Sequence, residues 1–268
     1  MSKITTIIFD WAGTVVDYGS FAPVDAFITA FEYFGVTPTM EETRAPMGLG
    51  KRAHIAQMLG GARIAEEWRK ARDAAFTDAD IDAVYERFEP ALFDVLASHA
   101  ELIPGVLDTV ERLQDKGIVI GSTTGYTRAM MDVVEREARR RGYRPDAVVC
   151  PDETGGIGRP YPYMLWRNLE KLGVPSIGSA LKIGDTAADM QEAVNAGCLC
   201  AGVLEGSSMV GLSEKEFAGL SAGEAEKILV GATRKYKEAG ADFVIEDITV
   251  LPKLIEAITR GAEHEYRV

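Results

Sequence analysis

The chain has 268 residues, 47% of them hydrophobic and 26% charged, which is ordinary for a soluble globular protein. Its formal net charge of −12, with no long basic run, argues against a nucleic-acid partner. No apolar run approaches the roughly 20 residues that span a bilayer and the amino terminus lacks a signal-peptide pattern, so we expect no membrane partner. Cys150, Cys198 and Cys200 lack metal-binding spacing and indicate a reducing, cytoplasmic location.

The first predicted element is a buried strand that delivers an aspartate. Residues 4–9 are mostly β-branched and apolar, the pattern of a strand buried on both faces. Asp10 ends this strand, and Gly13 begins a turn. Open α/β sheets bind their ligands at the carboxyl ends of their strands, so Asp10 is a candidate site residue. For such a motif in isolation, an aspartate that only caps the turn is the alternative.

The next elements are predicted to be helical. Helices are expected at about 23–35, 41–46, 52–59, 65–76 and 79–99, with a glycine- and proline-rich loop at 46–50. No convincing strand interrupts this stretch. We therefore expect residues 21–99 to form an all-helical cap domain inserted after the first strand.

The rest of the chain alternates helices with strands. Strands are expected at 118–121, 147–150, 181–184, 198–204 and 241–245, with helices between them. Alternating βα units indicate a parallel sheet covered by helices on both faces. The predicted fold is therefore α/β, with a Rossmann-like doubly wound core domain formed by residues 1–20 and 100–268.

Polar groups recur after the first strand in a chemically meaningful order. Thr124 and Gly125 follow the second strand, Arg159 lies in a glycine- and proline-rich loop, and Asp185 ends the strand at 181–184. Asp189 comes about one helical turn later. A carboxylate, a hydroxyl beside a glycine, a cation and a carboxylate pair supply a nucleophile, phosphate partners and a Mg²⁺ site. Together with Asp10 they predict phosphoryl transfer.

These stretches resemble the four motifs of the haloacid dehalogenase-like superfamily, and the resemblance spans nearly the whole chain. The matching stretches are Phe9-Asp10-Trp11-Ala12-Gly13-Thr14, Ser122-Thr123-Thr124-Gly125, Gly158-Arg159-Pro160 and Gly184-Asp185-Thr186-Ala187-Ala188-Asp189. The resemblance implies that Asp10 is the nucleophile and that Mg²⁺ binds Asp10, Asp185 and the backbone carbonyl of Ala12. It also implies that Asp189 supports the metal. Thr124, Gly125 and Arg159 are then expected to hold the oxygens of the phosphorus group.

Ala12 departs from the pattern of the phosphatases in that superfamily. They carry a second aspartate at this position as the general acid for an alcohol leaving group, and alanine cannot supply a proton. A phosphate-ester phosphatase or phosphomutase is therefore the alternative function. A catalytically silent protein that binds a phosphorylated ligand is an alternative of another class, although the retained motif residues argue against it.

The combination of these motifs with Pro46-Met47-Gly48-Leu49-Gly50-Lys51 and Gly158-Arg159-Pro160-Tyr161-Pro162 is similar to the branch of the superfamily that cleaves a carbon–phosphorus bond. The implied reaction is hydrolysis of phosphonoacetaldehyde to acetaldehyde and phosphate, in 2-aminoethylphosphonate degradation. A carbon leaving group needs an electron sink, and an imine between Lys51 and the aldehyde would provide it. Lys51 must then be neutral, so burial or a nearby cation is expected to lower its pKa. In another context, such a lysine would be a solvated charge.

His54 lies at i+3 from Lys51 and is predicted to face it and relay protons, with an ordinary surface histidine as the alternative. Met47 and Tyr126 match positions that surround the reactive end of the substrate in the family. Lys182 is a further cation near the site, but strand alternation leaves its direction ambiguous. The partner expected from the resemblance is a small phosphonate, and the resemblance also implies a homodimer.

Overall fold

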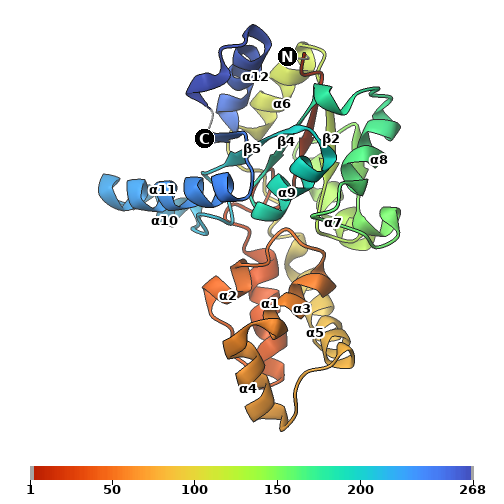
Figure 1. Cartoon of the computed structure of the whole chain (residues 1–268), viewed down its shortest axis with the longest axis vertical. Coiled ribbons are helices and arrows are strands. Elements are labelled where there is room, and N and C mark those ends of the chain that lie inside the picture. Colours follow the sequence, from red (N-terminus) through yellow and green to blue (C-terminus); the bar gives the residue numbers. More distant parts are fainter. Residues whose placement is uncertain (1–2, 267–268) are drawn as a thin grey trace.

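The computed structural model describes residues 3–266 and contains a six-stranded parallel sheet (Figure 1). The strands are β1 Thr6–Phe9, β2 Val119–Thr123, β3 Ala147–Val149, β4 Ala180–Gly184, β5 Leu199–Val203 and β6 Phe243–Ile245. Their order is β3-β2-β1-β4-β5-β6, and every neighbouring pair is parallel. The strand order reverses direction between β1 and β4, which is where open α/β sheets form ligand crevices.

The apolar residues of β1 pack on both faces of the sheet. Ile7 and Phe9 belong to the cluster formed with α6 Val106–Asp115, α7 Arg128–Arg140 and α12 Leu251–Arg260. Ile8 points the other way, into the cluster formed with α8 Tyr163–Leu172, α9 Ala187–Ala196 and α11 Ala222–Glu238. Successive side chains of a strand alternate between faces, so a fully apolar strand needs helices on both sides. The predicted doubly wound sheet is confirmed.

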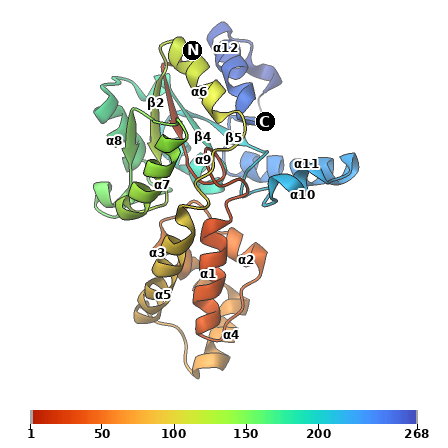
Figure 2. The same cartoon turned by 180° about the vertical axis from the view of Figure 1, so that it is seen from behind.

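Five helices gather away from the sheet, beneath the carboxyl ends of the strands (Figures 1 and 2). They are α1 Ala22–Tyr33, α2 Met40–Arg44, α3 Lys51–Gly60, α4 Ala62–Arg72 and α5 Asp78–Leu96. Phe27 of α1 stacks on Phe88 of α5 with ring centroids 4.1 Å apart. We propose that residues 21–99 form a cap domain, with 1–20 and 100–268 as the core domain.

The two connections between these groups of helices and strands lie side by side. Val16 forms an isolated antiparallel bridge with Leu102, and the N–H of Asp17 donates to the carbonyl of Glu101. The Asp17 carboxylate accepts the N–H groups of residues 21 and 22 at the start of α1. The entry into the helical group is therefore fixed by hydrogen bonds to one buried side chain.

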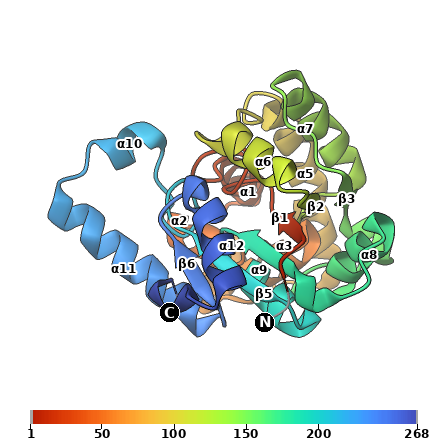
Figure 3. The same cartoon turned by 90° about the horizontal axis from the view of Figure 1, so that it is seen from above.

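The short helix α10 Glu214–Ala218 and the longer α11 extend sideways from the core as an arm (Figure 3). These two helices lie between β5 and β6, where the sequence predicts helical structure. Among residues 3–266, none of the helices combines the length and the apolar character needed to cross a membrane.

Candidate active site

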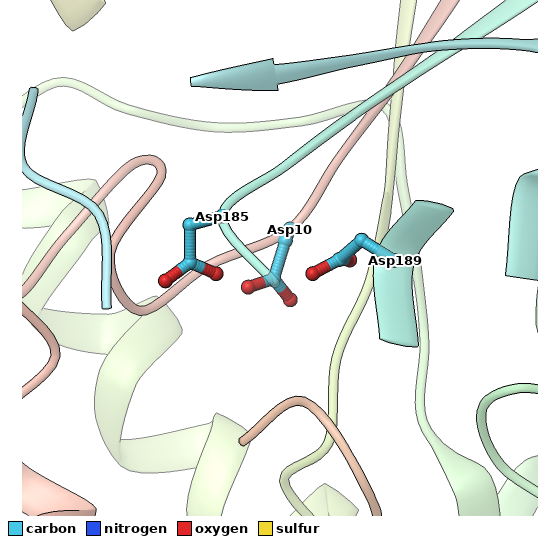
Figure 4. A group of neighbouring side chains, drawn as sticks. All are labelled: Asp10, Asp185 and Asp189. Carbon is cyan, nitrogen blue, oxygen red and sulfur yellow. The ribbon is translucent and has the colours of Figure 1, made fainter. Parts of the chain in front are cut away.

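Three carboxylates meet where β1 and β4 end (Figure 4). Asp10 follows β1, Asp185 follows β4, and Asp189 lies in the first turn of α9. All three are buried, and one oxygen from each lies within 4.8 Å of the others. Gly13 permits this approach, because a Cβ at its position would lie 2.1 Å from Asp185 Oδ2. So many buried like charges require cations close by.

Asp185 has no cation partner among the described side chains. Its Oδ2 accepts the N–H of Ser208 at 2.8 Å, while Oδ1 is buried and accepts no hydrogen bond. Burial, and then the charges of Asp10 and Asp189, raise the pKa of this carboxyl well above its usual value. A buried carboxylate oxygen without a partner, beside a second carboxylate, is the kind of donor that a hard divalent cation uses. The residues present therefore fit a metal ion.

Asp189 is different because cations already surround it. Its Oδ1 lies 2.9 Å from Lys182 Nζ and 3.0 Å from Arg159 Nη1, and its Oδ2 accepts the hydroxyl of Thr186 at 2.5 Å. Burial favours the neutral acid, but Arg159 and Lys182 outweigh it and hold the pKa of Asp189 below its usual value. With both oxygens engaged, Asp189 is better suited to support a metal than to ligate it directly.

Arg159 joins the nucleophile candidate to the interior of the core. Its Nη2 donates to Asp10 Oδ1 at 2.6 Å and to Thr123 Oγ1 at 2.9 Å, and its Nε donates to Glu192 at 3.1 Å. Its Nη1 is buried and forms the ion pair with Asp189 Oδ1 at 3.0 Å. No described residue donates a hydrogen bond to Asp10 Oδ2. One carboxylate oxygen is therefore held, and the other is available for chemistry.

Thr124 and Gly125 form the loop after β2, against the loop that precedes α3. Thr124 Oγ1 accepts the N–H of Tyr126 at 3.1 Å. A Cβ at Gly125 would lie 2.8 Å from the carbonyl oxygen of Leu49, and a Cβ at Gly48 would lie 2.3 Å from Thr186 Oγ1. The core and the helical group thus meet closely on two sides of the site, once against backbone and once against the Thr186 side chain.

Lys51 is the first residue of α3 and is buried, with 7% of its surface exposed. Its Nζ lies 4.6 Å from the ring centroid of Tyr126 and 5.8 Å from that of Phe27, and it forms no ion pair with a described residue. Burial lowers the pKa of this amine from 10.5 to about 8, although the Asp10 carboxylate opposes the shift. The expectation from the sequence that burial would lower this pKa is met.

His54 is buried beside Lys51 but does not line the cavity described below. Its ring stacks on Phe27 at 3.9 Å, and its Nε2 lies 2.8 Å from the carbonyl oxygen of Thr43. A carbonyl can only accept, so Nε2 carries the proton and the unpartnered Nδ1 keeps a lone pair. Burial and the Lys51 charge lower the pKa of His54 well below its usual value. An ordinary surface histidine is therefore the wrong description.

A small cavity between the sheet and the helical group brings the candidates together. The predicted site residues that line it are Asp10, Ala12, Met47, Lys51, Thr124, Gly125, Tyr126, Arg159 and Asp185. Asp189 and His54, the other two predicted site residues, are not part of its lining. Ser20, Pro23, Gly48 and Thr186 also line it and were not predicted.

The sequence reasoning missed three buried side chains next to Arg159. Thr123 and Glu192 were not singled out, and Lys182 was left unassigned. Thr123 lies inside one of the four motifs, which was the available signal. Lys182 was recognised as a cation near the site, but its direction was ambiguous. Glu192 offered no signal, since a charged residue in a helix is usually exposed.

The fold and the carboxylates at its strand ends define a class of hydrolases, and comparison with known proteins places the chain within it. The model of the haloacid dehalogenase-like hydrolases matches residues 4–197, and a HAD-hydrolase-like model matches residues 156–251. Phosphonoacetaldehyde hydrolase of Lysinibacillus sphaericus is 46% identical over 263 residues, which cover 98% of each chain.

Two further similarities point the same way. A bifunctional phosphonoacetaldehyde hydrolase/aminoethylphosphonate transaminase of Clostridioides difficile is 44% identical over 94% of this chain and 40% of its own length. The crystal structure of a phosphonoacetaldehyde hydrolase-like protein from Oleispira antarctica superposes with a TM-score of 0.93 at 32% identity, covering 100% of this chain and 96% of that one. The chain therefore belongs to the haloacid dehalogenase-like hydrolases and, within them, to the phosphonoacetaldehyde hydrolase family.

Proposed function

We propose that this protein hydrolyses the carbon–phosphorus bond of phosphonoacetaldehyde, releasing acetaldehyde and phosphate. The observation that carries the proposal is a buried lysine without an anionic partner, Lys51, in the same cavity as the Asp10 carboxylate. An amine suits an aldehyde, and a carboxylate suits phosphorus. The names of the relatives support this substrate, and the transaminase activity named in the bifunctional relative supports a place in 2-aminoethylphosphonate degradation.

In the first half of the proposed reaction, Lys51 forms an imine and Asp10 takes the phosphorus group. The neutral Lys51 amine adds to the aldehyde carbon, water leaves, and a protonated imine forms. Oδ2 of Asp10 then attacks phosphorus and the carbon–phosphorus bond breaks. The electron pair of that bond moves into the imine, which becomes an enamine, and the phosphorus group stays on Asp10 as an aspartyl-phosphate.

The second half restores both groups. The enamine accepts a proton on carbon, and water hydrolyses the resulting imine to release acetaldehyde and the Lys51 amine. A second water cleaves the aspartyl-phosphate, which returns the Asp10 carboxylate and gives phosphate. We assign His54 to these proton transfers, because its unprotonated Nδ1 is free and it packs on the same Phe27 ring as Lys51.

We propose Mg²⁺ as the cofactor, held by Asp10, Asp185 and the backbone carbonyl of Ala12, with Asp189 in support. The unpartnered Oδ1 of Asp185 supports this assignment. When bound, the ion supplies positive charge that compensates the oxygens of the phosphorus group.

The remaining cavity residues suit the two ends of the substrate. We assign Thr124, Gly125 and Arg159 to the phosphonate oxygens, because all three line the cavity with Asp10 and a guanidinium can bind two oxygens of an anion at once. Met47 and Tyr126 surround the aldehyde end. Burial raises the pKa of Tyr126 well above its usual value, so it stays neutral beside Lys51.

We further propose a cytoplasmic homodimer. All three cysteines are free thiols, which suits a reducing compartment such as the cytoplasm.

The resemblance to the family supports the dimer. Tyr161, Tyr163 and Trp166 form an exposed aromatic cluster, and we propose that a second copy covers it. Light scattering tests this: the parent is expected to be dimeric and Trp166→Glu to shift it toward monomer, and a monomeric parent contradicts the proposal.

Product analysis tests the proposed function directly. The purified protein, supplied with Mg²⁺, is incubated with phosphonoacetaldehyde, and phosphate and acetaldehyde are both quantified. We expect equal amounts of the two products and little phosphate from phosphate esters, because Ala12 provides no acid for an alkoxide. Efficient release from esters with none from phosphonoacetaldehyde would identify the phosphatase alternative instead.

A further inference from the structure

A buried polar cluster lies behind Arg159, outside the cavity. It consists of Thr123 at the end of β2, Lys182 in the middle of β4 and Glu192 in α9, and each of the three is fully buried. None of them lines the cavity, so none can touch a substrate there. Burying charged groups costs free energy even when they are paired, so a buried cluster of this kind calls for an explanation beyond packing.

The hydroxyl of Thr123 connects every member of the cluster. Its oxygen accepts from Lys182 Nζ at 2.7 Å and from Arg159 Nη2 at 2.9 Å, and its proton is donated to Glu192 Oε2 at 3.0 Å. A hydroxyl offers one donor and two acceptor positions, and all three are used here. The cluster thus adds two contacts to the guanidinium, one at Nη2 from Thr123 and one at Nε from Glu192, beside those from Asp10 and Asp189.

Lys182 balances the charge around Arg159. Its Nζ lies 2.9 Å from Asp189 Oδ1 and 3.5 Å from Glu192 Oε2, and both of these carboxylates also contact Arg159. Two cations thus share two carboxylates. Without Lys182, the guanidinium would be the sole described cation in contact with that pair, and less of its charge would remain for another anion.

We propose that Thr123, Lys182 and Glu192 are positioning residues that orient Arg159 and keep its charge available for the tetrahedral oxyanion of the substrate. The inference rests on the proposed role of Arg159 in binding phosphonate oxygens. It predicts that the cluster affects the affinity for the oxyanion and has no effect on imine formation at Lys51. A purely structural cluster would instead affect both halves of the site alike.

The test measures two properties of each variant with Mg²⁺ present. One is the dissociation constant of inorganic phosphate from calorimetry, and the other is borohydride trapping of acetaldehyde on Lys51. Thr123→Val removes the hydroxyl at nearly constant volume, and Thr123→Ser restores it. Thr6→Val is the matched control, because Thr6 is also fully buried in the sheet but its hydroxyl has no hydrogen-bond partner.

We expect Thr123→Val to weaken phosphate binding by about 10- to 100-fold, by analogy with the loss of affinity or activity when a hydrogen-bond partner of a metal ligand is removed. Thr123→Ser and Thr6→Val should stay close to the parent, and acetaldehyde trapping should be unchanged in all three. Lys182→Met gives a second measurement if Thr123→Val does not fold, and it should weaken phosphate binding in the same direction, because less of the Arg159 charge then remains for the oxyanion.

Unchanged phosphate affinity in Thr123→Val, or in Lys182→Met where that variant replaces it, overturns the inference. Loss of acetaldehyde trapping together with phosphate binding also overturns it, since that pattern means general damage to the fold. A parent that traps no acetaldehyde contradicts the proposed function instead, and the phosphate affinities then still decide whether the cluster acts on the oxyanion site.

Discussion

The two walls of the cavity handle charge in opposite ways. On the core wall, Asp10 and Arg159 are buried in an ion pair, and further carboxylates and cations are linked to them. On the wall formed by the helical group, Lys51 is buried against aromatic rings and has no ion-pair partner. The core wall stabilises its charges by pairing them, whereas burial on the opposite wall disfavours the charge of Lys51.

The same physical effect has different chemical consequences on the two walls. Burial raises the pKa of the Asp185 carboxyl and lowers that of the Lys51 amine, so it favours the neutral form of both groups. For an amine that attacks a carbonyl, the neutral form is the reactive one. For a metal ligand, the charged form is needed, and a bound cation restores it. Desolvation alone therefore suits Lys51, whereas Asp185 requires a cation as its partner.

Removing a carboxylate from the core wall should have the largest effect. We expect Asp185→Asn to lower turnover by about 10³-fold or more, because the phosphorus oxygens lose the charge compensation of a bound metal. The second readout is thermal stability with and without Mg²⁺. The parent should gain stability when Mg²⁺ is added, and the variant should gain little. An equal Mg²⁺-dependent gain in parent and variant contradicts the assignment of Asp185 as a ligand.

Removing the amine from the other wall should stabilise the fold. The pKa of Lys51 falls from 10.5 to about 8, so the ammonium form is disfavoured in the folded state. This cost is fully present below about pH 8 and disappears as the pH rises toward 10.5. Lys51→Met should therefore raise the free energy of unfolding at pH 7 by on the order of 3 kcal/mol, with a smaller gain at pH 10.

Urea unfolding of the parent and Lys51→Met at both pH values measures this difference. A variant less stable than the parent at pH 7 would mean that the amine is not held in a desolvated site. A gain of the same size at both pH values would mean that methionine simply packs better, and the desolvation account of Lys51 would be wrong.

A smaller effect on activity is expected when the contact between the two walls at Gly125 is disturbed. A Cβ at Gly125 would press on the carbonyl oxygen of Leu49 at 2.8 Å, so Gly125→Ala must displace the loop that leads into Lys51. We expect KM for phosphonoacetaldehyde to rise about tenfold, since misplacing reacting groups is costly. Gly231→Ala in α11 is the control, because its Cβ would meet nothing within 4 Å. Equal KM values in the two variants contradict the importance of this contact.

The substitution Ala12→Asp is expected to have the smallest effect on the rate of phosphonoacetaldehyde cleavage. An added acid serves an alkoxide leaving group, whereas the proposed leaving carbon passes its electrons to the Lys51 imine. The variant should therefore cleave phosphonoacetaldehyde no faster than the parent in a phosphate-release assay. Faster cleavage would show that protonation, and not the imine, limits departure of the carbon.

The core wall could be predicted from the sequence because its chemistry follows directly from the strands. The β-branched run before Asp10 and the apolar strand before Asp185 identify a parallel sheet, and carboxyl ends of neighbouring parallel strands meet. The helices and strands expected along the chain are all present, and they differ from the expected ranges mainly at their ends. Local patterns were sufficient for these features.

The other wall and the interior cluster could not be predicted in the same way. The burial of Lys51 depends on Phe27 and Tyr126, which come from distant parts of the chain, so only the family resemblance marked it. The direction of Lys182 was ambiguous because it depends on a threonine in another strand and a glutamate in a helix. Such contacts between distant residues have no signature in a single sequence.

Borohydride trapping with mapping of the modified peptide shows directly whether an imine forms on Lys51. Reductant should inactivate the parent only when phosphonoacetaldehyde or acetaldehyde is present, and the added mass should lie on the peptide that contains Lys51. Lys51→Arg keeps the positive charge but offers no free amine, so it should lose trapping and turnover as completely as Lys51→Ala. Substantial turnover by Lys51→Arg, or labelling of another lysine, contradicts the account.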